Sequence, residues 1–311
     1  MFVAQMNHTG RLTILLLTLI PHTASHAGEE KQASAAKTGL DTSVEAGSID
    51  QLENGADEYL LRYRFLEGEI IRYRSQKVGE LCLTVAGASK SDVERVEQVR
   101  RFLVTHIAES GLTDLVMQFE KIEMSRQVND DPPIVFRSTM KPSEVPPMFA
   151  RFADRLRRGA PQFAVMPTGT PTDESDEIRL PEKTDAPETR LMPPLPEAPV
   201  QIGESWSYIT PVKVRMAEEI TRKIRLLTTC RLESVENGIA RIKFSTLPER
   251  RLKSVLARSQ LVSARPQGYF LMDIETGRIN KRVIRNRNSV HGVRGPQSLV
   301  TYSSESVEEL L

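Results

Sequence analysis

The chain has 311 residues, of which 39% are hydrophobic and 27% are charged. This composition excludes a chain that is disordered throughout, and the length allows one large domain or two of ordinary size. The formal net charge of +1 excludes, for the chain as a whole, the strong charge imbalance that selects a highly charged partner.

The first 27 residues have the layout of a secretory signal peptide. Arg11 precedes the apolar run Leu12–Ile20, Pro21 ends it, and Ser25–Ala27 place small residues at positions −3 and −1 of a cleavage site. The run is shorter than the about 20 apolar residues of a spanning helix, and no later segment is apolar enough to span. We therefore expect an exported chain (periplasm, cell envelope or extracellular) that begins near Gly28. An uncleaved membrane anchor is the alternative.

Residues 28–57 are polar, small and poor in aromatics, so we expect a disordered tether. A first β-rich half follows over residues 58–169. In Leu61–Phe65 apolar residues alternate with arginines, a pattern typical of a half-buried strand, and we expect a hairpin with the strand after Gly68. The segment 93–107 is rich in β-branched residues and predicts a long strand.

A helix is predicted next, with Ser143 as its N-cap and Gly159 just beyond its end. Four apolar residues within Phe149–Leu156 share one of its faces. Residues 170–199 form a Pro-rich, acidic segment, because eight of the chain's 19 prolines lie in 167–199. We expect it to be an extended, solvated linker.

The second β-rich half, residues 200–311, repeats the order of the first. Gly-Glu-x-x-x-Tyr occurs at 68–73 and at 203–208, and Pro-Gln follows each predicted helix, at Pro161 and at Pro266. The predicted fold class is therefore mainly β (α+β), with two related antiparallel sheet halves, each packed with one amphipathic helix. The alternative is that two unrelated hairpin stretches look alike.

Over residues 59–311 the chain resembles uncharacterised secreted proteins abundant in planctomycete-type bacteria. That group has no assigned activity, so the resemblance implies export and a β-rich fold and carries over no site residues. The segments that carry it are YLLRYRFLEGEIIRY (59–73), LTVAGAS (83–89), PLPEAPVQIGESW (194–206) and VTYSSESVEELL (300–311).

Catalytic and metal-binding motifs are missing from the sequence. It has no phosphate-binding glycine loop, no Gly-x-Ser-x-Gly, no His-Glu-x-x-His and no Cys-x-x-Cys. After removal of the signal peptide only His106 and His291 remain as histidines. We therefore expect no catalytic residue, no metal and no cofactor, and we interpret Trp206, the single tryptophan, as a packing anchor.

The two cysteines, Cys82 and Cys230, both lie in strand-like segments. An exported compartment permits one disulfide between them. Two unrelated buried thiols are the alternative, because sequence does not show whether the two Cα atoms lie within bonding reach.

Charge is uneven along the chain. Residues 201–300 hold 19 lysines or arginines against 8 acidic residues, an excess of 11 positive charges. Such a stretch attracts polyanions, and outside the cytoplasm these are anionic lipid or an acidic envelope polymer rather than nucleic acid. A solvated strand face is the alternative. The candidate binding residues are Arg278, Lys281, Arg282, Arg285 and Arg287.

These patterns together predict an exported, non-enzymatic protein of the cell envelope that binds or scaffolds an unknown ligand. One alternative is a periplasmic carrier that holds an apolar ligand between two curved sheets. Another is a hydrolase with an unrecognised carboxylate or histidine site. A carrier needs a concave apolar surface, whereas a hydrolase needs clustered carboxylates or its histidines brought together.

Overall fold

The computed structural model describes residues 57–157, 159, 162–170, 192–216 and 220–311, and the backbone of 2–6 and 12–16. The chain divides into two compact units, Met1–Gly55 and Ala56–Leu311. In the first, β1 (Phe2–Met6) pairs antiparallel with β2 (Leu12–Leu16). The predicted cleavage site, nearly all of the tether and most of the Pro-rich linker lie outside the described residues. Within the described ranges, no helix has the length and apolarity needed to cross a membrane.

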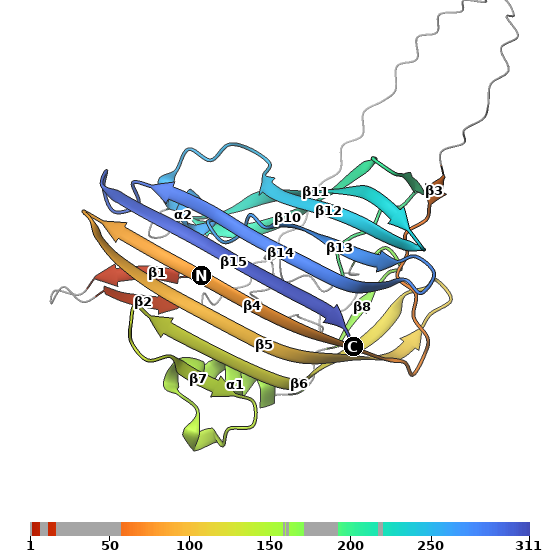
Figure 1. Ribbon diagram of the computed structural model, residues 1–311, viewed down its shortest axis with the longest axis horizontal. Coiled ribbons are helices and arrows are strands. Elements are labelled where there is room, and N and C mark those ends of the chain that lie inside the picture. The colour runs from red at the N-terminus through yellow and green to blue at the C-terminus, as the bar shows by residue number, and fades with distance from the viewer. Residues whose placement is uncertain are drawn as a thin grey trace, which may run out of the picture. The chain divides into compact units, whose positions relative to one another are not determined.

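The second unit is built on one antiparallel sheet of 11 strands (Figure 1). The first half of the chain contributes β4 (Ile70–Val85), β5 (Ala88–Ile107), β6 (Thr113–Val128), β7 (Ile134–Arg137) and β8 (Gln162–Val165). The second half contributes β10 (Ser205–Arg215), β11 (Thr221–Glu236), β12 (Ile239–Pro248), β13 (Gln267–Asp273), β14 (Arg278–His291) and β15 (Ser298–Leu310). The strand order is β10-β11-β12-β13-β14-β15-β4-β5-β6-β7, and β8 also pairs with β6.

The mainly antiparallel β fold predicted from the sequence is confirmed, but both halves belong to one continuous sheet. They join where β15 pairs with β4, from Ser298 opposite Val85 to Leu310 opposite Tyr73. This pairing satisfies the backbone hydrogen bonds of a long strand that would otherwise be an exposed edge of each half.

The hairpin predicted for Leu61–Phe65 is wrong. Only β3 (Glu58–Tyr59) is a strand there, and it pairs with β9 (Val200–Gln201). Beyond it the backbone is extended, and the Tyr63 N–H donates to the Pro167 carbonyl at 2.8 Å. The residues alternate because the segment lies on the sheet, with Leu61 and Tyr63 turned into the core.

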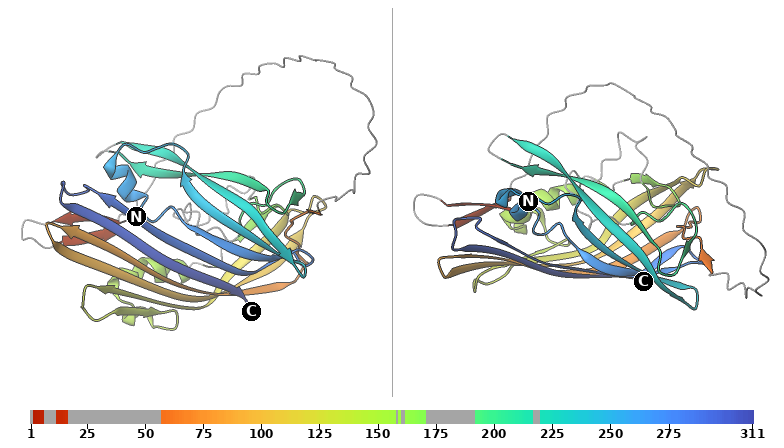
Figure 2. Two further views of the ribbon diagram at one scale, coloured as in Figure 1. Left: turned by 45° about the horizontal axis from the view of Figure 1, so that its top comes forward. Right: turned by 90° about the horizontal axis from the view of Figure 1, so that it is seen from above.

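Two helices pack on the same face of the sheet, which we call the inner face (Figure 2). The first, α1 (Ala150–Arg157), follows the 3-10 turns η1 (Pro142–Glu144) and η2 (Pro147–Phe149) and packs on β6 and β7. The second, α2 (Val255–Gln260), packs on β10 and β11. Ser254 caps α2, because its Oγ accepts the Ala257 N–H at 3.2 Å.

A covering segment, residues 192–200, lies over the inner face on the largest core cluster. Its prolines cannot donate backbone hydrogen bonds, but their carbonyls accept them. The Tyr63 hydroxyl donates to the Pro193 carbonyl at 3.0 Å, and the Trp206 indole N–H donates to the Pro194 carbonyl at 2.9 Å. Trp206 is thus a packing anchor, and it also holds the covering segment in place.

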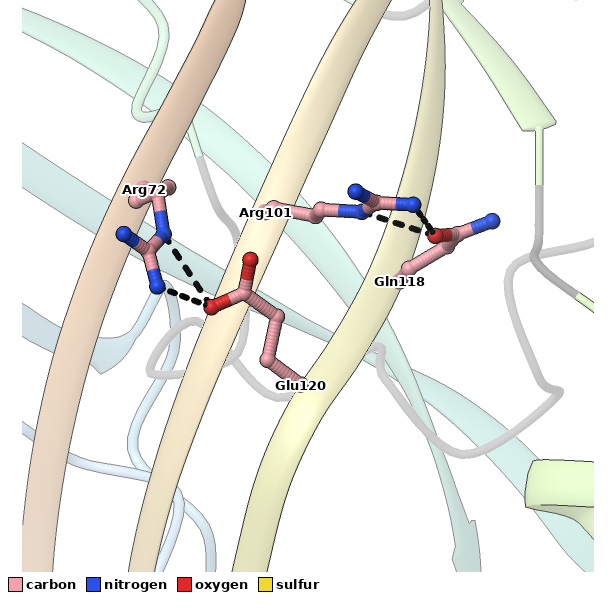
Figure 3. A network of polar contacts seen from close by, with 4 residues as sticks. All are labelled: Arg72, Arg101, Gln118 and Glu120. Carbon is pink, nitrogen blue, oxygen red and sulfur yellow. Dashed lines mark hydrogen bonds and ion pairs between the residues drawn. The ribbon is translucent and has the colours of Figure 1, made fainter.

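On the opposite, outer face, polar side chains of neighbouring strands contact one another. Arg72 on β4 reaches across β5 to Glu120 on β6, and Arg101 on β5 donates to Gln118 at 2.8 Å (Figure 3). Glu120 is the extra residue of a β-bulge, since Arg100 opposes Phe119 and Val99 opposes Lys121. The bulge turns Glu120 toward Arg72.

Candidate ligand-binding site on the inner face

A small cavity lies between the inner face, the covering segment and the extended residues 60–66. Its volume is about 20 Å³, which is room for one water-sized group. Most of its wall is apolar or aromatic, and its polar wall comes from a guanidinium, a carboxylate and two phenols. The lining comprises Tyr63, Phe65, Ile71, Tyr73, Phe102, Met192, Gly277, Arg278, Ile279 and Glu308.

A buried group of charges borders this cavity. Glu308 on β15 lies directly opposite Arg282 on β14, and their Oε1 and Nη2 atoms are 2.9 Å apart. The same carboxylate also pairs with Arg100, which projects from β5 on the far side of β4. The three side chains are only 6%, 7% and 11% exposed. A second ion pair joins Arg278 to Glu69, with the Arg278 guanidinium 4.8 Å from the centre of the Phe65 ring.

Burial sets the protonation of these groups. It lowers the pKa of Arg100 to about 9, with repulsion from Arg282 as the second cause, so the guanidinium stays charged at neutral pH. Burial raises the pKa of Tyr73, and the nearby cations, led by Arg278, offset this only in part. Burial also raises the pKa of Tyr63 well above its ordinary value. Both phenols therefore remain O–H donors in the physiological range.

The five cations predicted to form one binding patch lie in different environments. Arg278 is buried and lines the cavity, and Arg282 is buried beside Glu308, which also lines it. Lys281 and Arg285 lie on the outer face, where they pair with carboxylates of β15, and Arg287 is exposed opposite Ser303. Side chains alternate between faces along a strand, so a run of cations in sequence does not form one surface.

Sequence reasoning missed four residues of the cluster, Glu69, Tyr73, Arg100 and Glu308. A signal for Arg100 was present, because it has the same strand parity as the buried residues Phe102 and Val104. A charged residue at an inward position of a strand needs a partner, and this requirement marks it as special.

A second cationic feature lies beside α2. A groove of about 390 Å³ is lined by Arg251, Leu252, Lys253 and Arg258. In the part of the chain that the structure describes, no carboxylate pairs with these three cations. Leu256 on the same helix is 45% exposed. The groove can therefore attract an anionic group from solution.

The remaining predicted site residues contribute no chemistry to the cavity. Cys82 and Cys230 are both free thiols, which agrees with the alternative of two unrelated thiols rather than with the possible disulfide. They lie on β4 and β11, which four strands of the sheet separate. His106 and His291 are exposed. Among the described residues, no three His, Cys, Asp or Glu side chains gather into a metal-binding group.

Comparison with known proteins identifies no family. No family model matches the chain, and no curated protein matches its sequence. Among solved structures, one from a study of lipid–protein interactions in lipovitellin has a TM-score of 0.48 at 10% identity, over 80% of this chain and 25% of that chain. The present chain thus spans about a quarter of that protein.

Two further solved structures have lower scores. DynF, from the dynemicin biosynthesis pathway of Micromonospora chersina, has a TM-score of 0.19 at 7% identity, over 86% of this chain and 92% of that one. A DUF1329 family protein from Desulfovibrio piger ATCC 29098 has a TM-score of 0.15 at 11% identity, over 74% and 83%. None of the three scores supports an argument about function.

Proposed function

We propose that this chain is an exported, non-enzymatic binding protein that carries an amphipathic small molecule between the inner face and the covering segment. The observation that carries the proposal is the largely apolar cavity with its polar wall, the lining typical of small-molecule sites. Export is supported by the layout of residues 1–27 and by the resemblance to secreted proteins.

A molecule larger than the cavity enters if part of the cavity wall moves. Met192 lies at the start of the covering segment and lines the cavity. Its side chain is unbranched and adapts readily to a changed neighbour. Leu195, in contrast, is buried and its N–H donates to the Thr168 carbonyl at 2.8 Å. The Met192 side is thus the deformable part of the wall.

A hydrolase has less support. Neither His106 nor His291 hydrogen-bonds to an acidic residue or a serine among the described residues, and both are exposed. Glu308 lines the cavity and Glu69 pairs with the lining residue Arg278, so each carboxylate is engaged by arginine. These arginines compete with a substrate water for the carboxylate oxygens.

We also propose that the two halves are copies of one unit. Each half forms three long antiparallel strands, then a helix on the inner face, then a strand that begins at the Gln of Pro-Gln and pairs with the third strand; the first half also has the short β7 before its helix. In the first half this last pair is β8 on β6, and in the second it is β13 on β12. Duplication would explain one helix at each flank of the sheet. Superposition of β4–β8 on β10–β13 in an experimental structure tests it, and helices on opposite faces would overturn it.

The binding test uses neighbouring residues of opposite orientation. Ile71 lines the cavity and is 4% exposed, whereas Ile70 is on the outer face and is 53% exposed. A neutral fluorescent probe, N-phenyl-1-naphthylamine, should bind wild type saturably. Ile71→Phe should weaken this binding by about tenfold or more, and Ile70→Phe should not. Circular dichroism and thermal melts confirm that both variants fold.

Native mass spectrometry of protein purified from its own envelope identifies the bound molecule. It also shows whether residues 1–27 are removed. A probe that fails to bind, together with protein that carries no small molecule, would contradict the carrier function.

A second candidate function is docking on anionic lipid through the groove at α2, where cations lie beside the exposed Leu256. The double reversal Arg251→Glu/Lys253→Glu should reduce sedimentation with phosphatidylglycerol vesicles at low salt. The control reversal Arg95→Glu/Arg287→Glu changes charge equally on the outer face. Equal retention of the two variants would exclude docking through α2.

A further inference from the structure

Five charged side chains gather around the cavity. Three guanidiniums, from Arg100, Arg278 and Arg282, meet two carboxylates, from Glu69 and Glu308. Tyr73 lies within electrostatic reach of all three arginines and of Glu69, so the two ion pairs form one cluster around it. Within this cluster Arg100 and Arg282 share Glu308, whereas Arg278 pairs with Glu69.

Two hydrogen-bond donors of the cluster are unused. Within the described part of the chain, Arg100 Nε and Arg278 Nη1 are buried and have no hydrogen-bond partner. The two side chains are only 11% and 10% exposed. A buried donor without a hydrogen-bond partner is unfavourable. A bound anion would accept hydrogen bonds from these donors.

The position of the cluster identifies the chemistry of that anion. Arg278 and Glu308 form part of the cavity wall, and Phe65, Ile71, Phe102 and Ile279 form the apolar part of it. A ligand that satisfies both parts has an anionic end and an apolar body. Guanidinium groups bind carboxylate and phosphate oxygens with paired N–H donors.

We propose that the buried arginine cluster binds the anionic group, carboxylate or phosphate, of the amphipathic ligand, with the apolar body against the aromatic wall. This inference rests on the proposed function, because it places the head group of the carried molecule. Arg278 is the residue that contacts this group from the cavity wall. Arg100 and Arg282 hold Glu308, which also lies in the cavity wall.

The first experiment needs no variant. Displacement of N-phenyl-1-naphthylamine is measured for a fatty acid, an alkyl phosphate and a fatty alcohol of the same chain length. The acid and the phosphate should bind at least about tenfold more tightly than the alcohol. Equal affinities for acid, phosphate and alcohol would overturn the anion site while leaving the carrier function intact.

A variant then assigns the preference to the cluster. Arg278→Gln leaves Glu69 unpaired, and that carboxylate is 29% exposed and accessible to water. It should weaken binding of the acid by about tenfold and leave binding of the alcohol unchanged. Lys281→Gln, on the outer face, is the matched control. An equal loss for acid and alcohol in Arg278→Gln would contradict the proposal.

Inorganic phosphate and acetate test whether the anion site exists even if the carrier function fails. If no amphiphile binds but either small anion binds in an Arg278-dependent manner, measured by thermal shift, then the carrier function fails and the anion site stands. If neither amphiphiles nor small anions bind, both proposals fail, and the arginines have a purely structural role.

Discussion

Arg100 on β5 pairs with Glu308 on β15 across the intervening strand β4. Tyr73 of β4 lies directly opposite both Arg100 and Leu310, so the ion pair runs diagonally past it on the inner face. Three strands are thereby connected by side chains in addition to their backbone hydrogen bonds. The connection lies at the junction of the two halves of the chain, where β15 meets β4.

Loss of this carboxylate should destabilise the protein strongly. Glu308→Gln leaves the buried Arg100 and Arg282 without their anion, so we expect the free energy of unfolding to fall by about 3–5 kcal/mol. Glu309→Gln is the control, because Glu309 pairs with Lys281 on the solvated outer face and should have little effect. Urea denaturation of both variants measures the difference. Equal losses would show that the buried pair is not special.

Gly268 should not tolerate a side chain. An added Cβ would lie 1.9 Å from the Val283 carbonyl oxygen on β14. Gly268→Ala should therefore destabilise the fold by about 2 kcal/mol or more. At Gly79 the nearest atom is the movable Tyr302 hydroxyl at 3.2 Å, so Gly79→Ala should cost much less. A thermal melt compares them, and a tolerated Gly268→Ala would contradict the close approach of β13 and β14.

The two thiols should differ in reactivity. Cys82 is half-buried, whereas Cys230 is fully buried in the core. Since the thiolate reacts and burial keeps Cys230 a thiol, iodoacetamide should modify Cys82 first under native conditions. Mass spectrometry after timed labelling measures the order. Both should react in denaturant without prior reduction, and a need for reduction would indicate a disulfide.

Cys230 should also make stability depend on pH. Burial raises its pKa from 9.0 to about 12, so between these values the unfolded state has lost a proton that the folded state keeps. The contribution is complete below pH 9.0 and declines above it by about 1.4 kcal/mol per pH unit. Between about pH 8 and about pH 10.5, the free energy of unfolding measured by denaturation should fall less for Cys230→Ala than for wild type. Equal losses would contradict the raised pKa.

The indole of Trp206 should hold the covering segment in place. Trp206→Phe removes the hydrogen bond to the Pro194 carbonyl and should lower stability by about 1 kcal/mol. Hydrogen exchange of the Leu195 N–H, which bonds the Thr168 carbonyl, should become faster. Tyr269→Phe on the outer face is the control. Unchanged exchange at Leu195 would show that the indole does not anchor this segment.

The site could be predicted only in part. The sequence indicated that Arg278 and Arg282 belong to a binding region, but it grouped them with Lys281 and Arg285, whose partners Glu309 and Glu305 lie on the other face. Strand parity separates these residues once the register is known. The β-bulge near Lys281 breaks that parity, and such an irregularity is set by packing rather than by local sequence.

Local patterns determined the turns and the strand-rich character of the chain. Asn237 and Gly238 both adopt positive φ in the hairpin turn between β11 and β12, and an Asn-Gly pair is typical of such turns because few other residues accept that conformation. The β-branched residues of β5 likewise predicted a long strand, because such side chains fit the pleated surface of a sheet. These features depend on interactions between near neighbours in the chain, which the sequence contains in full.

Tertiary structure decided that the two halves form one sheet, and it brought Arg100 to Glu308. Both depend on the pairing of β15 with β4. These strands are neighbours in the sheet, although they come from opposite ends of the sequence of the second unit. Backbone hydrogen-bonding groups are the same in every strand, so composition does not specify which strand pairs with which. The buried charge cluster exists only where this pairing places an inward arginine beside an inward glutamate.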